Sequence, residues 1–217
     1  MFDKLKLQNK VFVLLPCLLL VLFFSGCVTL STFQGPETLQ QGKTVTGGGI
    51  TMTVREEDDD RLPSYELFAR YGVTENFDVG LKVAGIFTTV GFDLKYRFLD
   101  STKLMGSFDM AFSYASLEDD DSVLADNTFS VYGFYPALIL GTEKAYFGPK
   151  LVYLVGRGDF DDFIMNDERL PSKKVIPGLF AGYKIKLFGS LKAIPEITLY
   201  YTPDYGLWLY GGLALEI

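Results

Sequence analysis

The sequence predicts an all-β fold: an antiparallel up-and-down transmembrane β-barrel of about ten strands after a cleaved signal peptide. Three observations support this prediction. Residues 44–217 alternate apolar and polar side chains with a period of two, segments of strand length recur along them, and short and long connections alternate. We therefore expect one β-barrel domain at 44–217, and the residues before it divide into a leader at 1–26 and a tether at 27–43, whose lipid anchor is implied by a motif described below.

The first segment has the features of an export signal. Lys4, Lys6 and Lys10 give it a positive start, and an uncharged apolar run follows from Val11 to Phe24. A transmembrane helix takes about 20 apolar residues, whereas the core of a signal peptide takes about 7–15. The run is therefore predicted to be removed on export.

A short motif follows the apolar run. Phe24-Ser25-Gly26-Cys27 resembles the lipobox of bacterial lipoproteins, although that family usually has Leu where this chain has Phe24. The resemblance implies cleavage before Cys27 and acylation of its thiol, for example with palmitate. Lipoproteins kept in the inner membrane usually carry Asp next, so Val28 implies the outer membrane. The alternative is an ordinary signal peptide that leaves Cys27 as a free thiol.

Residues 28–43 show little periodicity. Gly35-Pro36 and Gln40-Gln41-Gly42 are typical of irregular chain, so the sequence predicts a tether between the lipid and the first strand.

Beyond the leader the chain is acidic. Residues 27–217 contain seventeen Lys and Arg against twenty-six Asp and Glu, a formal charge of −9. Nucleic-acid binding needs clustered basic side chains, so this balance argues against a nucleic-acid partner. These residues contain no second long apolar run, and a closed barrel is the other structure that satisfies every backbone polar group in lipid.

Alternation within each segment separates an apolar face from a charged face. Phe92, Leu94 and Tyr96 share one face, whereas Asp93 and Lys95 share the other. The pattern predicts strands at 44–54, 64–72, 77–85, 88–99, 103–115, 128–140, 145–157, 174–187, 190–202 and 206–217. Strands two, four, six and eight precede short turns, so an even strand number places both termini on the short-turn side, which is periplasmic in this interpretation.

Two segments resemble outer-membrane barrels. Residues 70–80 look like the strand-turn-strand unit of porin-like proteins, and 212–217 is similar to the C-terminal signal read by the barrel-assembly machinery. The family usually ends in Phe or Trp, whereas this chain ends in Ile217, and Gly211 stands where a polar residue is usual. The resemblance implies a bacterial outer-membrane barrel whose partners are the assembly machinery and outer-membrane lipids.

Enzyme chemistry finds little support in the residues. The chain contains no His, which barrel proteases, phospholipases and lipid A-modifying enzymes require. Without His or a free mature Cys we expect no transition metal, no other metal site is assigned, and no cofactor is predicted. Gly47-Gly48-Gly49 lies in a strand with no helix after it, so we interpret it as a kink or bulge rather than a phosphate loop. A carboxylate-only glycosidase is a distant alternative.

Acidic residues gather in three predicted long loops, at Glu56–Asp60, Glu118–Asp121 and 159–168. They suit a solvated rim, or one that shares divalent ions with anionic lipopolysaccharide.

The charged face of the strands predicts the barrel interior. Side chains that would line a narrow pore are Arg70, Lys82, Asp93, Lys95, Arg97, Asp109, Lys150, Lys184, Lys186, Lys192 and Glu196, and Glu66 and Asp78 share their face. The same charges could equally close the lumen by pairing with one another. Eight basic against five acidic residues would make an open pore prefer anions.

Two function classes follow from these observations. The first is a non-enzymatic outer-membrane barrel lipoprotein with a structural, surface-interaction or narrow small-solute pore role. The second is a lipid-anchored soluble carrier resembling lipocalins, whose apolar face would point inward to hold a hydrophobic ligand. The sequence predicts neither a solute nor an oligomeric state.

Overall fold

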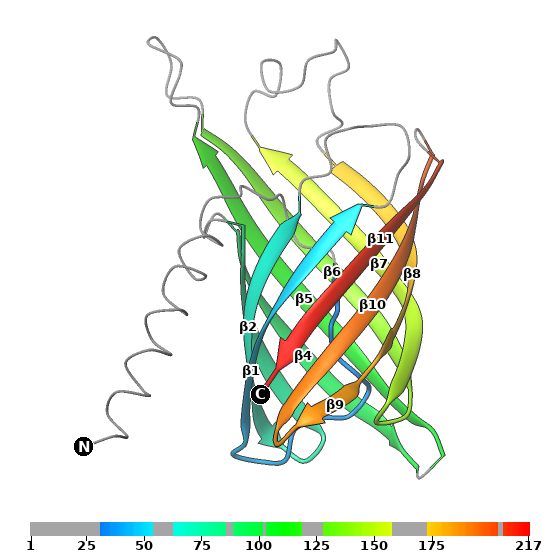
Figure 1. The fold of residues 1–217 in the computed structure, drawn as a ribbon. Helices are drawn as coiled ribbons and strands as arrows, with labels where there is room; N and C mark the ends of the chain where they lie inside the picture. The colour runs from blue at the N-terminus through cyan, green and yellow to red at the C-terminus, as the bar shows by residue number, and fades with distance from the viewer. Residues whose placement is uncertain are drawn as a thin grey trace, which may run out of the picture.

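The described residues form an antiparallel β-barrel (Figure 1). The computed structural model describes residues 31–53, 63–85, 89–101, 103–118, 128–157, 173–203 and 206–217. The strands are β1 (Thr44–Thr53), β2 (Ser64–Thr74), β3 (Phe77–Ala84), β4 (Thr89–Asp100), β5 (Met105–Glu118), β6 (Thr128–Gly141), β7 (Ala145–Arg157), β8 (Lys173–Tyr183), β9 (Ile185–Phe188), β10 (Leu191–Thr202) and β11 (Gly206–Glu216).

Pairing between the last and first strands closes the ring. β11 pairs with β10 on one side and with β1 on the other, where Gly49 faces Ala214 and Thr51 faces Gly212. β9 continues β8 along β10 with only Lys184 between them, in the same register as far as Lys186, and the pairing then shifts by one residue so that Phe188 lies opposite Leu191. Counted as one, they make a closed ten-stranded antiparallel barrel, which confirms the predicted fold class.

One predicted strand is interrupted. The sequence predicts a continuous strand over 174–187, but the regular ladder ends at Tyr183 and resumes at Ile185. The backbone N–H of Lys184 donates instead to the carbonyl of Lys144 (2.7 Å). The interruption lies at the end of the barrel that carries the short turns.

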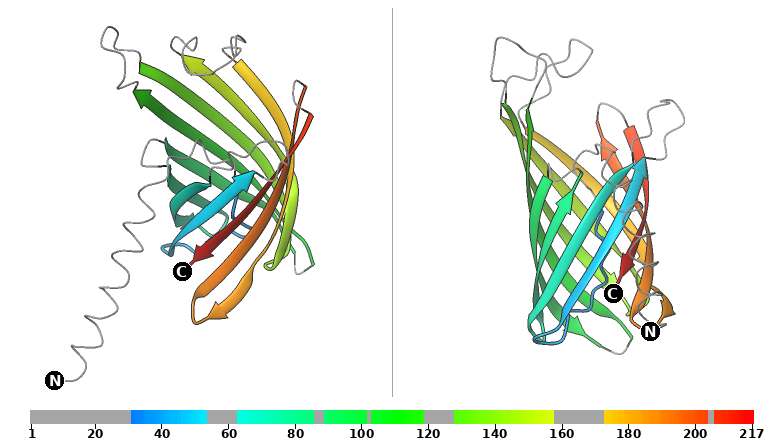
Figure 2. Two further views of the ribbon diagram at one scale, coloured as in Figure 1. Left: turned by 45° about the horizontal axis from the view of Figure 1, so that its top comes forward. Right: turned by 60° about the vertical axis from the view of Figure 1, so that its left-hand side comes forward.

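The two ends of the barrel differ, as predicted. Short turns such as Glu75-Asn76 and Gly189-Ser190 lie at one end, together with the start of β1 and the C-terminal residue Ile217 (Figure 1). The connections at 54–62, 119–127 and 158–172 leave the other end and lie outside the described residues. The predicted acidic loops therefore also lie outside them, apart from Glu118, the last residue of β5. β5 to β7 rise higher on this side than β2 and β3 (Figure 2).

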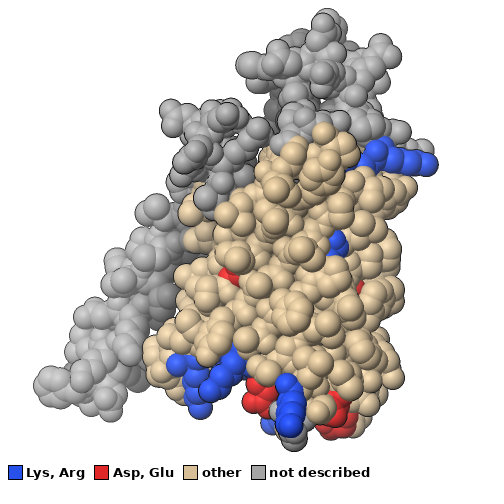
Figure 3. Space-filling model, turned by 90° about the vertical axis from the view of Figure 1, so that its right-hand side faces the viewer, with Lys and Arg blue, Asp and Glu red and all other residues tan. Residues whose placement is uncertain are grey.

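The outer wall of the barrel is apolar. Large side chains expose a third to three quarters of their surface on every strand, including Leu67, Leu81, Phe92, Phe108, Tyr132, Phe147, Leu179, Ile197, Leu209 and Leu213. One face of the molecule shows a largely uncharged wall, with most of its charged side chains gathered at the lower edge (Figure 3). Alternation thus places the apolar set outside, so the lipocalin-like alternative, which needs it inside, is wrong.

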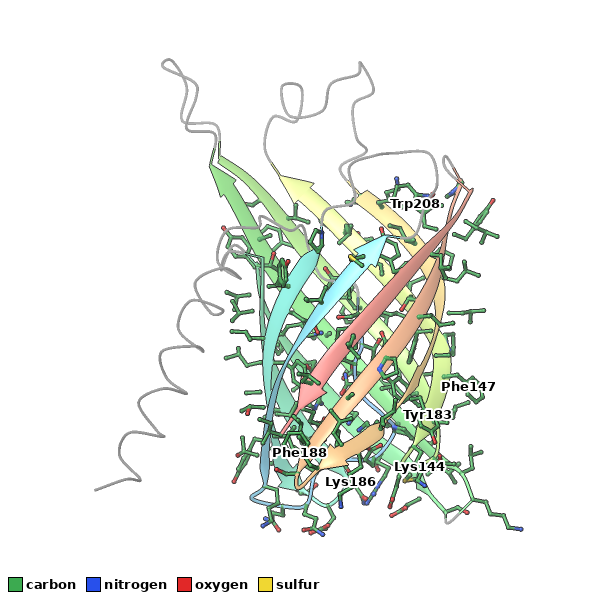
Figure 4. The ribbon with its side chains drawn as sticks, in the orientation of Figure 1. Lys144, Phe147, Tyr183, Lys186, Phe188 and Trp208 are labelled. Carbon is green, nitrogen blue, oxygen red and sulfur yellow. The ribbon has the colours of Figure 1, made fainter. Side chains whose placement is uncertain are left out.

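Aromatic residues lie near this lower edge. Figure 4 shows Phe147, Tyr183 and Phe188 near the end of the barrel that carries Lys144 and Lys186. Phe147 is 57% exposed and Phe188 is 73% exposed. Aromatic girdles beside an apolar band are the pattern of barrels embedded in lipid. Among the described residues, no helix is long and apolar enough to cross a membrane.

Candidate functional site

The lumen contains the chain's own N-terminal segment, which we call the plug (Ser31–Gln40). Residues 32–36 are buried, and the blue trace in Figures 1 and 2 runs inside the ring of strands before it turns into β1. The sequence predicts a tether between the lipid and the first strand here, and the structure places its residues Ser31–Gln40 inside the lumen. The segment is irregular, as expected, and side chains of the strands bind five of its backbone groups directly.

Glu196, in the middle of β10, holds the plug at its centre. The backbone N–H groups of Thr32 and Phe33 each donate to one of its carboxylate oxygens at 2.7 Å. The Tyr146 hydroxyl also donates to Glu196, at 2.9 Å. Phe33 has a φ of +46°, which non-glycine residues adopt rarely, and this turn aims two successive N–H groups at one anion. The carboxylate therefore stabilises a backbone conformation that costs about 1–3 kcal/mol by itself.

Basic and acidic wall residues bind the rest of the plug. Lys150 Nζ donates to Thr32 Oγ1 (3.1 Å), and Lys95 Nζ donates to the Gly35 carbonyl (3.2 Å). Further contacts join Gln34 Nε2 to Asp109 (2.8 Å), Lys82 Nζ to the Ser31 carbonyl (3.2 Å), the Leu39 N–H to Asp78 (3.1 Å), and Glu37 to Lys184.

Wall residues also pair with one another. Arg70 bridges Asp78 and Asp93, with its Nη1 at 2.6 Å from Asp93 Oδ1. Lys82 lies 3.2 Å from Glu66, and Lys95 lies 3.6 Å from Asp78. Buried ions are costly unless paired and hydrogen-bonded, and this network provides both.

The predicted lining residues fall into three groups. Inside the lumen, buried or half-buried against the plug or one another, are Arg70, Lys82, Asp93, Lys95, Asp109, Lys150, Lys184 and Glu196. Arg97 and Lys192 lie at the short-turn rim, where they pair with Asp100 and Glu216. Lys186 is exposed, because all of β9 lies at this edge of the barrel, so its assignment to the lumen is wrong.

Sequence reasoning missed residues on both sides of this network. Glu37 of the plug and Glu216 of β11 add two carboxylates, and Lys186 leaves the basic set. Counted together with the rim residues Arg97, Lys192 and Glu216, the described interior holds seven basic and seven acidic side chains in place of eight and five. This removes the charge excess from which anion preference was predicted.

Apolar residues fill the lumen below and beside the plug. Phe33 joins a buried cluster in the short-turn half of the barrel with Ala137, Ile139, Tyr146, Phe180, Ile194 and Ala214. A second cluster around Tyr135, Val152 and Tyr200 lies toward the loops. A cavity of about 40 Å³ remains beside Ser31, which is room for one or two waters.

Inward-facing glycines make room for the plug. A Cβ added to Gly49 would lie 2.7 Å from the Phe33 ring, and one added to Gly212 would lie 2.6 Å from it. The ladders of β1 keep a regular register on both sides, so Gly47-Gly48-Gly49 contains no bulge. Gly49 instead leaves the space that Phe33 occupies. The sequence signal that could have predicted this contact is a glycine at an inward-facing strand position together with an apolar residue in the segment before the barrel.

This fit gives a double-mutant test. Gly49→Ala is expected to lower the free energy of unfolding by about 1–3 kcal/mol, because the new methyl group meets the Phe33 ring. In a Phe33→Ala background the same change should be neutral or favourable, since alanine suits a strand better than glycine by about 0.5–1 kcal/mol. Urea unfolding followed by the fluorescence of Trp208 measures both, and outward-facing Gly48→Ala is the control. Equal effects in the two backgrounds would show that Phe33 does not lie against Gly49.

No protein-family model and no curated protein matches this chain. Solved structures of outer-membrane proteins do. Ail of Yersinia pestis in a phospholipid nanodisc is 16% identical, covering 82% of this chain and 100% of its own, with a TM-score of 0.35. The N-terminal β-barrel domain of Pseudomonas aeruginosa OprF is 12% identical, with coverage of 82% and 100% and a TM-score of 0.32. Neisserial surface protein A is 10% identical, with coverage of 80% and 92% and a TM-score of 0.31. Each likeness concerns the barrel alone.

Proposed function

We propose that this chain is a non-enzymatic β-barrel of the bacterial outer membrane with a structural or surface-interaction role, whose lumen is closed by its own N-terminal segment. The observation that carries this proposal is the plug: its backbone N–H groups at Thr32 and Phe33 are held by Glu196 in the middle of the barrel. A conducting pore needs a continuous water path, and here polypeptide occupies it.

The membrane location rests on the outer wall. Exposed apolar side chains on every strand would be unstable in water, and closure leaves no open sheet edge to face lipid. The outer rather than the inner membrane follows from the barrel architecture together with the predicted lipobox.

The absence of enzymatic activity rests on how the ionisable groups are used. The sequence contains no His, and the buried carboxylates of the described interior accept hydrogen bonds or pair with Lys and Arg. The described residues contain no group of Asp, Glu or Cys arranged to hold a metal ion. The interior is thus organised to hold a peptide segment.

Acylation of Cys27 remains part of the proposal, and this residue lies outside those that the structure describes. The long acidic loops would provide the interaction surface, with lipopolysaccharide and divalent ions as partners of suitable charge. Residues 212–217 would be read by the barrel-assembly machinery.

A narrow pore is the competing function, and conductance decides between the two. Purified, folded protein in planar bilayers is expected to give no discrete conductance above that of the bare bilayer, because the plug and the apolar cluster around Phe33 fill the lumen. Heat-modifiable gel migration verifies folding, and an established porin in the same bilayers is the positive control. Regular current steps from the wild-type protein would refute the closed lumen.

A further inference from the structure

The plug crosses the lumen in one direction. Ser31 Oγ donates to Glu66 (2.7 Å) and the Ser31 carbonyl accepts from Lys82 (3.2 Å), which lie two residues from the loop-side ends of β2 and β3. At the other end, Thr38 Oγ1 donates to the carbonyl of Glu75 in a short turn (2.6 Å). Rising residue number therefore means descent from the loop side toward the short turns.

Packing inside the lumen prevents the residues before Ser31 from returning toward the short-turn side. Below Ser31 the lumen holds Thr32 to Gln40 and, in the short-turn half, the apolar cluster of Phe33, Tyr146 and Phe180. On its other side Ser31 borders the small cavity, whose walls include Ala84 and Thr89. These two residues end β3 and begin β4, at the loop-side rim. The free direction from Ser31 therefore leads to the loop side.

Chain length is consistent with this exit. Ser31 is four positions after Cys27, and these four steps span at most about 14 Å when extended. Lys82, beside Ser31, is two residues from the end of β3, a rise of about 7 Å. Cys27 can thus reach the loop-side rim over the low wall formed by β2 and β3.

We propose that the chain enters its own barrel from the loop side, so that the mature N-terminus and the acyl chains on Cys27 lie on the same side of the membrane as the long loops. The inference rests on the proposed function, and it reverses the sequence-based expectation that both termini are periplasmic. The C-terminus stays on the short-turn side, where Ile217 pairs with Thr46. A thioether-linked lipid would then insert in the outer leaflet.

Cysteine labelling on intact cells tests this topology in the full-length protein. After removal of the leader the only cysteine is Cys27, which acylation blocks, so single new cysteines report their own side. Thr29→Cys tests the N-terminus, Asp120→Cys in the β5–β6 connection marks the loop side, and Glu143→Cys in the β6–β7 turn marks the opposite side. The probe is a membrane-impermeant maleimide.

We expect Thr29→Cys to label on intact cells to the same extent as Asp120→Cys, while Glu143→Cys labels only after permeabilisation. Labelling of Thr29→Cys only after permeabilisation, or only after denaturation, would overturn the proposed path. If Asp120→Cys and Glu143→Cys label to the same extent on intact cells, the barrel does not span the membrane and the proposed function itself is wrong. Labelling of the wild-type protein on intact cells would support the topology, but it would also show that the Cys27 thiol is free and therefore not acylated.

Discussion

Replacing Glu196 by alanine is expected to cost about 3–5 kcal/mol of unfolding free energy, one of the two largest single-residue effects that the structure predicts. The change leaves three buried donors without an acceptor: the N–H groups of Thr32 and Phe33 and the hydroxyl of Tyr146. An orphaned buried donor costs about 1–3 kcal/mol. Nothing else in the described lumen replaces the carboxylate under the strained turn at Phe33.

Two measurements check this result in lipid or detergent. Urea unfolding followed by Trp208 gives the free energy, and hydrogen exchange gives the protection of the Thr32 and Phe33 amides, which the variant should lose. Glu196→Gln keeps one carbonyl oxygen and should lose less. Asp100→Ala removes a carboxylate that is exposed at the rim, so its cost should stay below about 1 kcal/mol. Unchanged protection of the two amides in Glu196→Ala would contradict the role assigned to Glu196.

Replacing Leu81 by arginine is expected to destabilise the inserted barrel by about 2–4 kcal/mol, the cost of a charge near the middle of a lipid-facing strand. Leu81 lies on β3 opposite Ala69 and Phe92, and it is 54% exposed. In a water-soluble barrel a residue this exposed would tolerate the change within about 0.5 kcal/mol. The measured loss therefore distinguishes a wall that faces lipid from one that faces water.

Unfolding in liposomes and heat-modifiable migration on gels report this loss. Glu143→Arg, in a short turn beyond the apolar wall, is the matched control and should have little effect. Equal and small effects of both changes would argue against insertion. Changes to inward-facing residues are also expected to be costly. Lys95 is 97% buried and hydrogen-bonded to the plug, so Lys95→Gln should be destabilising as well.

The barrel could be predicted from sequence because its signal is local. Alternation such as Phe92-Asp93-Leu94-Lys95 assigns each side chain to a face without knowledge of the partner strand. Most of the residues predicted to face the interior accordingly do so. The prediction for Lys186 is wrong because alternation assigns a side chain to a face of the sheet but does not show how far along the barrel axis it lies. The break at Lys184 lies where its N–H donates to the carbonyl of Lys144, in the turn before the neighbouring strand β7.

The plug could not be predicted because its order comes from distant residues. Thr32 is bound by a carboxylate 164 positions away, and Gln34 by one 75 positions away. Gly35 and Pro36 are typical of irregular chain in either setting, so composition did not separate a free tether from a buried segment. Glu37 was missed for the same reason, since it lies outside every predicted strand.

The contact of Phe33 with both Gly49 and Gly212 constrains the order of assembly. These glycines belong to the first and last strands and lie beside the seam, where Gly49 pairs with Ala214 and Thr51 with Gly212. A ring already paired along this seam would have to admit the Phe33 side chain and its polar neighbours Thr32 and Gln34 between the closed strands. The N-terminal segment must therefore be in place while the sheet is still open, and the first and last strands then pair around it. Pairing of β1 with β11 then both closes the barrel and encloses the segment.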